Sequence, residues 1–434
     1  MSCEKCAKTG TDHSVPRRPR RRAEAADPVA GGQSGLSRLS PLPLLALFLT
    51  ACTQQPRIDP QLASEIEKIK AIDNHAHPVR PGNPPDTDFD ALPVEHLDPY
   101  SEPIRTRADS PIVAEARQKM QNVDKSNSAA VLDALGIDVM LANRVTMSPP
   151  VTEPRFRFVG YVDALMYPLD NTPMMKDPDK KAFFPLEEAL LKRYYPDPKP
   201  ATLDDYLDKV VRPVLEAHKK SGAIAEKFEM AYLRALDVGN PSKQDAEKAY
   251  LGEGAYKDLQ DYIFRFIATE CGRLGMAIHI HVCASAGAYF DIAGTNPILL
   301  EPLLHDPAMR KTNFVLLHGG WPFIGEITAL LENPNVYTDF SEQTYNGYPR
   351  EVSVNIRKWL EYEPEKVMFA TDAYPFSKEI GWEEAGYIAN KTGREALGLA
   401  LTGMLRDEEI NRDRAIQLAR MVLRENARKL YNLN

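Results

Sequence analysis

The feature that most constrains the fold is a repeated alternation of short apolar runs with longer amphipathic stretches. It begins after residue 57 and continues through most of the chain. This alternation is typical of βα units, in which helices connect parallel strands. Eight such units predict an α/β fold, a closed (β/α)₈ TIM-like barrel, with an open doubly wound sheet as the alternative.

The predicted strands are the short β-branched and apolar runs. They are Ala71–Asn74, Ile137–Leu141, Phe158–Val162, Ala223–Phe228, Ala277–Val282, Asn313–Leu317, Asn335–Phe340 and Lys366–Ala370. Apolar residues at helical spacing precede Gly275, which is expected to end a helix as its C-cap. Pro213 predicts a kink in an earlier helix. Pro78–Ser128 reads as an insertion after strand one, and the tail after Asp407 reads as helical.

The first 52 residues have the features of a targeting segment rather than of a folded domain. An arginine-rich stretch, 17–22, precedes a short apolar run, 42–49, that is too short to span a bilayer. The run ends in Leu49-Thr50-Ala51-Cys52, which resembles a bacterial lipobox whose cysteine is lipidated. We therefore expect a basic segment with a lipoprotein signal peptide over 1–52, a tether over 53–67 and the barrel domain over 68–434. The alternative is a buried cysteine.

This assignment predicts a protein of the bacterial cell envelope, held to the membrane through Cys52. The formal net charge is −8 and the only strong basic run lies in the leader, so we expect no nucleic-acid partner. Cys3 and Cys6 form a single C-x-x-C without a partner pair, which is weak support for a zinc site.

Polar residues gather where the predicted strands end, and barrel enzymes place their sites at these ends. Strand one leads into Asp73-Asn74-His75-Ala76-His77, and alternation along a strand puts the two histidines on one face. Strand five ends in His279-Ile280-His281, strand six is followed by His318 and strand eight by Asp372.

Each of these motifs alone has an ordinary structural explanation, such as a core histidine or an N-cap aspartate. Together they place five of the nine histidines and one carboxylate on the same rim. Histidine and carboxylate ligands suit a divalent metal, most naturally zinc, with manganese or iron as alternatives.

The order of these motifs resembles the amidohydrolase superfamily, in its amidohydrolase-related branch. The stretches Phe156–Leu165, Phe314–His318, Val336–Ser341 and Val367–Ala373 are similar to the amidohydrolase half of family members fused to glutamine synthetase. The resemblance covers residues 68–434 and implies a metal-dependent enzyme that acts on a small molecule, with a homodimer as a further expectation.

The resemblance also implies roles for individual residues. His75, His77, His281 and Asp372 correspond to metal ligands, and Asp372 also handles the proton. His318 corresponds to the residue that binds a second metal or polarises the substrate.

Two further residues have open roles. Lys227, at the end of strand four, matches a lysine that some members carboxylate to bridge two metals. The alternative, which we favour with a single metal, is that Lys227 pairs with Glu229 or binds an anionic substrate. Arg234 could hold a substrate carboxylate or be a solvated helix residue.

The predicted reaction is hydrolysis of a C–N or C–O bond by water activated at the metal, with Asp372 as general base and His318 stabilising the oxyanion. Asp73 is expected to orient a ligand histidine or to help close the barrel. One alternative is a metal-dependent decarboxylase on the same fold. Another is a surface lipoprotein that binds a metal or a small molecule without catalysis.

Overall fold

The computed structural model describes residues 57–92, 103–177, 180–284 and 291–433. Clustering of contacts separates residues Met1–Thr53 from Gln54–Asn434, and only the second unit contains described residues. The predicted leader, with Cys3, Cys6 and Cys52, therefore lies outside the described residues.

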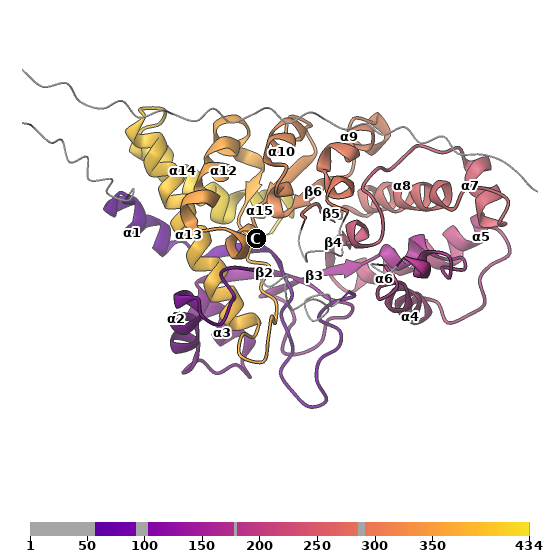
Figure 1. Ribbon diagram of the computed structural model, residues 1–434, viewed down its shortest axis with the longest axis horizontal. Coiled ribbons are helices and arrows are strands. Elements are labelled where there is room, and N and C mark those ends of the chain that lie inside the picture. The colour runs from indigo at the N-terminus through magenta and orange to yellow at the C-terminus, as the bar shows by residue number, and fades with distance from the viewer. Residues whose placement is uncertain (1–56, 93–102, 178–179, 285–290, 434) are drawn as a thin grey trace, which may run out of the picture. The chain divides into compact units, whose positions relative to one another are not determined.

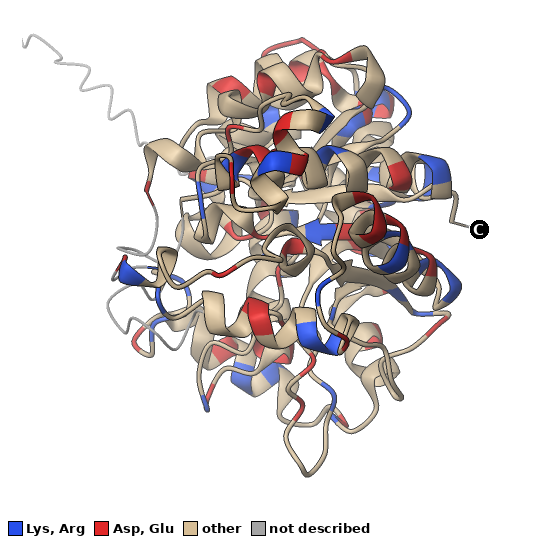
Figure 2. Ribbon diagram, turned by 90° about the vertical axis from the view of Figure 1, so that its right-hand side faces the viewer, with Lys and Arg blue, Asp and Glu red and all other residues tan. Residues whose placement is uncertain are grey.

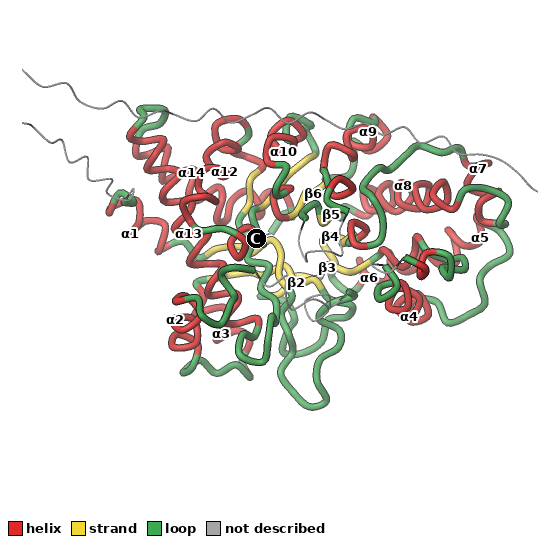
Figure 3. The backbone as a smooth tube through the Cα atoms, viewed as in Figure 1, coloured by secondary structure: helices red, strands yellow, loops and turns green. Residues whose placement is uncertain are grey.

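Eight parallel strands form one sheet in the order β1 to β8, each hydrogen-bonded to its neighbours in sequence (Figures 1 and 3). The strands are β1 Ala71–Ala76, β2 Ile137–Asn143, β3 Phe156–Tyr161, β4 Ala223–Phe228, β5 Ala277–His281, β6 Phe314–Leu317, β7 Val336–Asp339 and β8 Val367–Met368. All eight predicted strands are confirmed, with ends that differ by up to two residues.

The first and last strands approach each other through their backbones just beyond the short β8. The amide of Asn74 donates to Phe369 O at 3.0 Å, and the amide of Asp372 donates to His75 O at 2.7 Å. The amide of His77 donates to Ala373 O at 2.9 Å. The sheet therefore closes into the predicted (β/α)₈ barrel and not the open alternative.

Helices surround the strands on the outside (Figure 1). They are α1 Pro60–Lys68, α2 Pro111–Met120, α3 Ser128–Leu135, α4 Phe184–Tyr194, α5 Leu203–Tyr206, α6 Arg212–Lys220, α7 Lys243–Tyr250, α8 Tyr256–Leu274, α9 Glu301–Leu304, α10 Ile324–Leu330, α11 Gln343–Asn346, α12 Pro349–Tyr362, α13 Trp382–Arg406, α14 Arg412–Arg420 and α15 Asn426–Leu430. Because helices cover the outer face and side chains fill the inner one, the strands are buried on both sides and read as nearly continuous apolar runs.

A small apolar cluster fills the inside of the barrel. Ile72, Val159 and Val315 from three strands meet Ala427 and Leu433 from the C-terminal tail in this cluster. The helical tail predicted after Asp407 is confirmed by α14 and α15, and its last residues take part in the barrel core.

Two local predictions can be compared with the structure directly. Gly275 caps α8 with φ 65°, a backbone conformation that costs glycine little. Pro213 lies in the first turn of α6, directly after a π-helical turn, Leu207–Val211. The wider turn brings the Arg212 amide to Leu207 O, so the irregularity predicted from Pro213 takes the form of a π turn next to the proline.

The insertion after β1 contains α2 and no strand within its described residues. In the described residues we find no helix with the length and apolar character needed to cross a membrane. On the face shown in Figure 2, acidic and basic residues alternate over the outer helices.

Candidate metal centre

Four of the predicted ligands and catalytic residues lie at the carboxyl ends of their strands. His75 is in β1, His281 ends β5, His318 follows β6 and Asp372 follows β8. The three histidines are at most 3% exposed. The parallel strands deliver these side chains to the same end of the barrel, as the sequence predicted.

Three donor atoms converge between β1 and β8. Asp372 Oδ1 lies 3.1 Å from His75 Nε2 and 3.3 Å from His77 Nε2, and the two Nε2 atoms are 3.3 Å apart. His75, His77 and Asp372 thus form one group of residues that could hold a metal ion.

A second group of potential ligands lies beside the first. It consists of His281, His318 and Glu342. The rings of His281 and His318 are 4.6 Å apart, and the ring of His318 is 5.1 Å from that of His75. His281 is therefore grouped with His318, whereas the sequence analysis placed it with His75, His77 and Asp372.

Glu342 was missed by the sequence analysis. It follows β7 by three residues, and Glu342 Oε2 lies 3.9 Å from His318 Nδ1. An acidic residue just beyond a strand end was an available signal. Glu342 was overlooked because the stretch compared with the amidohydrolases stopped at Ser341.

Backbone strain is concentrated at these two groups. His318, Glu342 and Asp372 have φ values of 64°, 58° and 53°, and they are three of the five non-glycine residues with positive φ in the described chain. Such conformations are disfavoured for residues with a Cβ, and they gather where function requires a particular side-chain direction. Hydrogen bonds hold the strained amides, as in His318 N to Asp339 Oδ1 at 2.9 Å.

Two hydroxyl groups determine which ring nitrogen of a histidine is protonated. Tyr161 Oη lies 3.0 Å from His77 Nδ1, and Asp90 Oδ2 lies 3.6 Å from the same nitrogen. Because a carboxylate beside Nδ1 favours a proton on that nitrogen, the tyrosine oxygen accepts from His77 Nδ1–H. The lone pair of His77 Nε2 is then directed to the first group.

A similar arrangement is found at His318. Ser341 Oγ donates to Asp339 Oδ1 at 2.6 Å and lies 2.8 Å from His318 Nδ1. The hydroxyl therefore accepts from His318 Nδ1–H, which leaves Nε2 as the unprotonated nitrogen. Hydroxyl acceptors of this kind are the outer partners that metal-binding histidines require, because they fix the tautomer and orient the ring.

The electrostatics of the site favour neutral imidazoles beside an ionised carboxylate. Burial is the main cause that lowers the pKa of His75 and of His318 well below its usual value, and it lowers the pKa of His281 to about 3. Burial alone would raise the pKa of Asp372, but the neighbouring histidines more than offset this and lower it well below its usual value. Neutral imidazoles and a carboxylate are the ligands of a divalent cation such as zinc, so this donor set fits such a metal.

The remaining predicted residues have other partners. Lys227, in β4, is buried with its Nζ 3.7 Å from Glu229 Oε1, as the alternative to a carboxylated lysine proposed. Arg234 forms an ion pair with Asp261, in which Nη1 lies 2.7 Å from Oδ1. Neither Lys227 nor Arg234 is part of the two groups of potential ligands.

Two further polar residues, His279 and Asp73, make their contacts inside the barrel, below the rim. His279 Nε2 lies 2.7 Å from Tyr431 Oη of the C-terminal tail, so this histidine points into the barrel interior. Asp73 accepts from the Thr371 amide at 2.8 Å and from its hydroxyl, which ties β1 to the segment after β8. Asp73 thus helps to close the barrel.

Comparison with known proteins identifies sequences and structures that this chain resembles. Residues 245–433 match the family model described as Amidohydrolase. Over 147 residues the chain is 29% identical to Protein fluG of Emericella nidulans, a match that covers 33% of this chain and only 16% of that protein.

Solved structures share the fold. A presumed metal-dependent hydrolase of Lactobacillus casei superposes with a TM-score of 0.59 at 16% identity, over 87% of this chain and 98% of that one. Uronate isomerase of Thermotoga maritima gives 0.54 at 15% identity, over 86% and 96%. The family match confirms the resemblance to the amidohydrolases and supports a metal-dependent enzyme, while the structural likenesses show the barrel fold.

Proposed function

We propose that this chain, whose residues 245–433 match the amidohydrolase family, is a metal-dependent hydrolase that cleaves a C–N or C–O bond of a small molecule. The observation that carries the proposal is the position of Asp372. One carboxylate oxygen, Oδ1, faces His75 and His77, and the other, Oδ2, lies 3.9 Å from His318 Nδ1. A single carboxylate can therefore serve the metal and the reacting groups together.

The proposed ligands are His75, His77 and Asp372, with His281 as a further ligand as the sequence analysis predicted. When bound, the metal supplies Lewis acidity and lowers the pKa of water. Asp372 accepts the proton that is released, since it is ionised, and returns it to the leaving group. His318 presents an unprotonated Nε2 and lies next to Asp372, so it would bind a metal or accept a proton and would not donate to the substrate oxygen.

Metal analysis of the purified protein tests the first half of this proposal. We expect about one equivalent of a divalent metal per chain, with zinc or manganese favoured. About two equivalents would add the group of His281, His318 and Glu342 as a second site. A folded protein that neither carries a metal nor takes one up after incubation with zinc and manganese would overturn the proposal.

A substrate screen on the metal-loaded protein tests the second half. Esters, amides and aromatic acids are incubated with the protein, and both water-dependent products and released CO₂ are measured. Hydrolysis of an ester or amide supports the proposal. Evolution of CO₂ without hydrolysis supports the decarboxylase instead, and tight metal binding with no turnover of any compound supports a binding protein.

We also propose that Cys52 is lipidated and anchors the protein to the bacterial envelope, facing the periplasm or the exterior. The support is the sequence Leu49-Thr50-Ala51-Cys52 after an apolar run. The change Cys52→Ala should move the protein from the membrane fraction to the soluble fraction. Cys283→Ala, which changes a buried cysteine of the barrel, is the control and should leave the distribution unchanged. Membrane retention of the Cys52→Ala protein would refute the anchor.

A further inference from the structure

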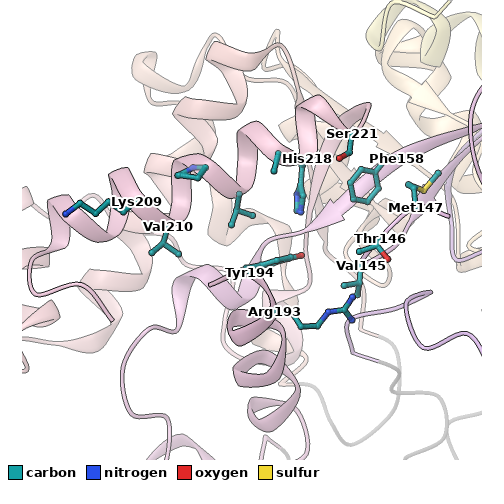
Figure 4. Close-up of a pocket in the computed structure, with 13 residues that line it drawn as sticks. Val145, Thr146, Met147, Phe158, Arg193, Tyr194, Lys209, Val210, His218 and Ser221 are labelled. Atoms are coloured by element: carbon teal, nitrogen blue, oxygen red, sulfur yellow. The ribbon is translucent and has the colours of Figure 1, made fainter. Parts of the chain in front are cut away.

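A cavity of about 590 Å³ lies on the outside of the barrel, between α4 and α6 (Figure 4). Its lining comes from the segment after β2, from β3, from the end of α4, and from α6 with the turn before it. None of the proposed metal ligands lines this cavity. Pockets that hold small organic ligands usually enclose roughly 300–1,000 Å³, so the volume suits a molecule with one or two rings.

Three rings form an aromatic wall of the cavity. The ring of His218 lies 5.3 Å from that of Phe158 and 5.4 Å from that of Tyr194, both in edge-to-face contact. Val210 and Val214 add apolar surface. A flat apolar ring could pack against this wall, because aromatic pairs prefer offset or edge-to-face contacts.

The charged part of the lining is basic. Arg193, Lys209 and His218 line the cavity, and no acidic side chain does. Arg193 Nη1 bonds Asp88 and Lys209 Nζ bonds Asp205, each at 2.8 Å, but both carboxylates lie outside the lining. The Arg193 side chain is 47% exposed, and its other guanidinium nitrogens can still donate.

A buried carboxylate, that of Glu226, orients His218 as a hydrogen-bond donor. Its Nδ1 lies 3.0 Å from Oε2 of Glu226, which is fully buried in β4. Although burial alone would lower the pKa of His218, the charge of Glu226 and its hydrogen bond raise it above the usual value. The other ring nitrogen, Nε2, has no hydrogen-bond partner among the described residues and is not one of their buried unpaired atoms.

We propose that this cavity is a binding site for a small aromatic carboxylate, distinct from the metal centre. The ring lies against Phe158, Tyr194 and His218, and the carboxylate faces the basic side chains of Arg193 and His218. Charge and shape support the same ligand class, since the lining offers cationic donors beside an apolar aromatic wall and no carboxylate that would repel the ligand. The inference does not depend on the reaction at the metal centre.

Calorimetric titration of the metal-loaded protein with benzoate and with benzamide tests the proposal. The two probes have nearly the same shape, but only benzoate is charged. We expect benzoate to bind at least tenfold more tightly than benzamide. Equal affinity for the two probes, or no binding of either, would overturn the proposal.

Two substitutions locate the site and separate it from the metal centre, which could also bind a carboxylate. Ala217→Trp, at an exposed position of the lining, should fill the cavity and abolish binding of benzoate while the protein keeps its metal. Arg193→Gln should weaken benzoate about tenfold and leave benzamide unchanged, as expected for the loss of one charge-assisted hydrogen bond. Lys192→Gln, on the same helix but outside the lining, is the matched control.

The substitutions can either support the proposed binding site or overturn it. Loss of benzoate binding in Ala217→Trp together with weakening in Arg193→Gln, but not in Lys192→Gln, supports the site. Benzoate binding that survives Ala217→Trp would place the ligand elsewhere, at the metal for example, and would overturn the inference. Circular dichroism of each variant shows whether its fold is intact.

Discussion

Asp372 and His75 are joined twice across the closure of the barrel. The backbone amide of Asp372 donates to His75 O at 2.7 Å, and Oδ1 of Asp372 lies 3.1 Å from His75 Nε2. Asp372 reaches this position with φ 53°, a conformation that aims its side chain back at the neighbouring strand. The barrel closure and the proposed metal site thus depend on the same residue, and strain at this point is held by the contacts that form the site.

The first prediction concerns the proton role of Asp372. Asp372→Asn keeps the size of the side chain but removes its negative charge and its ability to accept a proton. We expect kcat for the hydrolysed substrate to fall at least about 100-fold, the usual range for loss of a general base. Metal content, measured on the same sample, should fall much less. Turnover near the wild-type value with metal bound would contradict the proposed role.

The second prediction concerns the contact of Tyr161 with His77. Tyr161→Phe keeps the ring but removes the acceptor for His77 Nδ1–H. Loss of such a partner typically weakens metal binding about 10-fold to 100-fold. Competition with a zinc chelator measures the change. Tyr167→Phe is the control, because the buried Tyr167 hydroxyl has no hydrogen-bond partner in the described residues. Equal zinc affinity in the Tyr161 and Tyr167 variants would refute the role of Tyr161 in orienting His77.

The sequence was sufficient to find the residues that strands position. His75, His281 and His318 lie at strand ends, and in a barrel all parallel strands end on one rim. The apolar periodicity that marks each strand therefore predicts that these three side chains lie close together. The place of Glu342 just after β7 was visible in the sequence, but the direction of its side chain was not, because that direction depends on a positive φ in the loop.

Partners that are distant in sequence were also beyond prediction. Tyr161 meets His77 only because β3 and β1 lie close around the barrel, and Tyr431 meets His279 only because the C-terminal tail joins the barrel core. Neither pairing leaves a local pattern in the sequence. The same holds for the cavity between α4 and α6, which depends on how two outer helices pack.

The third prediction concerns the space beside the buried pair of His218 and Glu226. Gly160, in β3, has no side chain, and a Cβ there would lie 2.5 Å from His218 Nδ1 and 2.8 Å from Glu226 Oε2. Gly160→Ala should therefore separate the pair and leave a buried charge without its partner, at a cost of roughly 3 kcal/mol. Urea unfolding measures this loss.

The matched control for this substitution is Gly325→Ala in α10. A Cβ at Gly325 would have only Lys358 Nζ near it, at 3.7 Å, and alanine favours a helix by up to about 1 kcal/mol over glycine. Unchanged or increased stability is therefore expected in the control. A Gly160→Ala protein as stable as the wild type would show that the pair can move aside without loss.

The last prediction concerns Asp59, which connects the first and the penultimate helices. Its carboxylate caps α1 by accepting from the amides of Gln61 and Leu62, and it pairs with Arg412 at 2.9 Å. The hydrogen bond from Arg412 and then that from the Leu62 amide lower the pKa of Asp59 from 3.8 to about 2. Asparagine is an equally good N-cap, so Asp59→Asn removes the charge and keeps the cap.

The sign of the pH dependence follows from the lowered pKa. A carboxylate with a lower pKa in the folded state stabilises the protein above the unfolded value of 3.8, and this contribution is lost as the pH falls through about 2. Because both side chains of the pair are partly exposed to solvent, we expect Asp59→Asn to cost no more than about 1 kcal/mol near neutral pH. The difference in urea midpoint between wild type and variant should shrink steadily below about pH 4. Asp413→Asn is the control, because Asp413 has no ion pair in the described part of the chain, and it should show no such trend. A difference between wild type and Asp59→Asn that persists unchanged at the lowest pH would mean that Arg412 contributes nothing through charge.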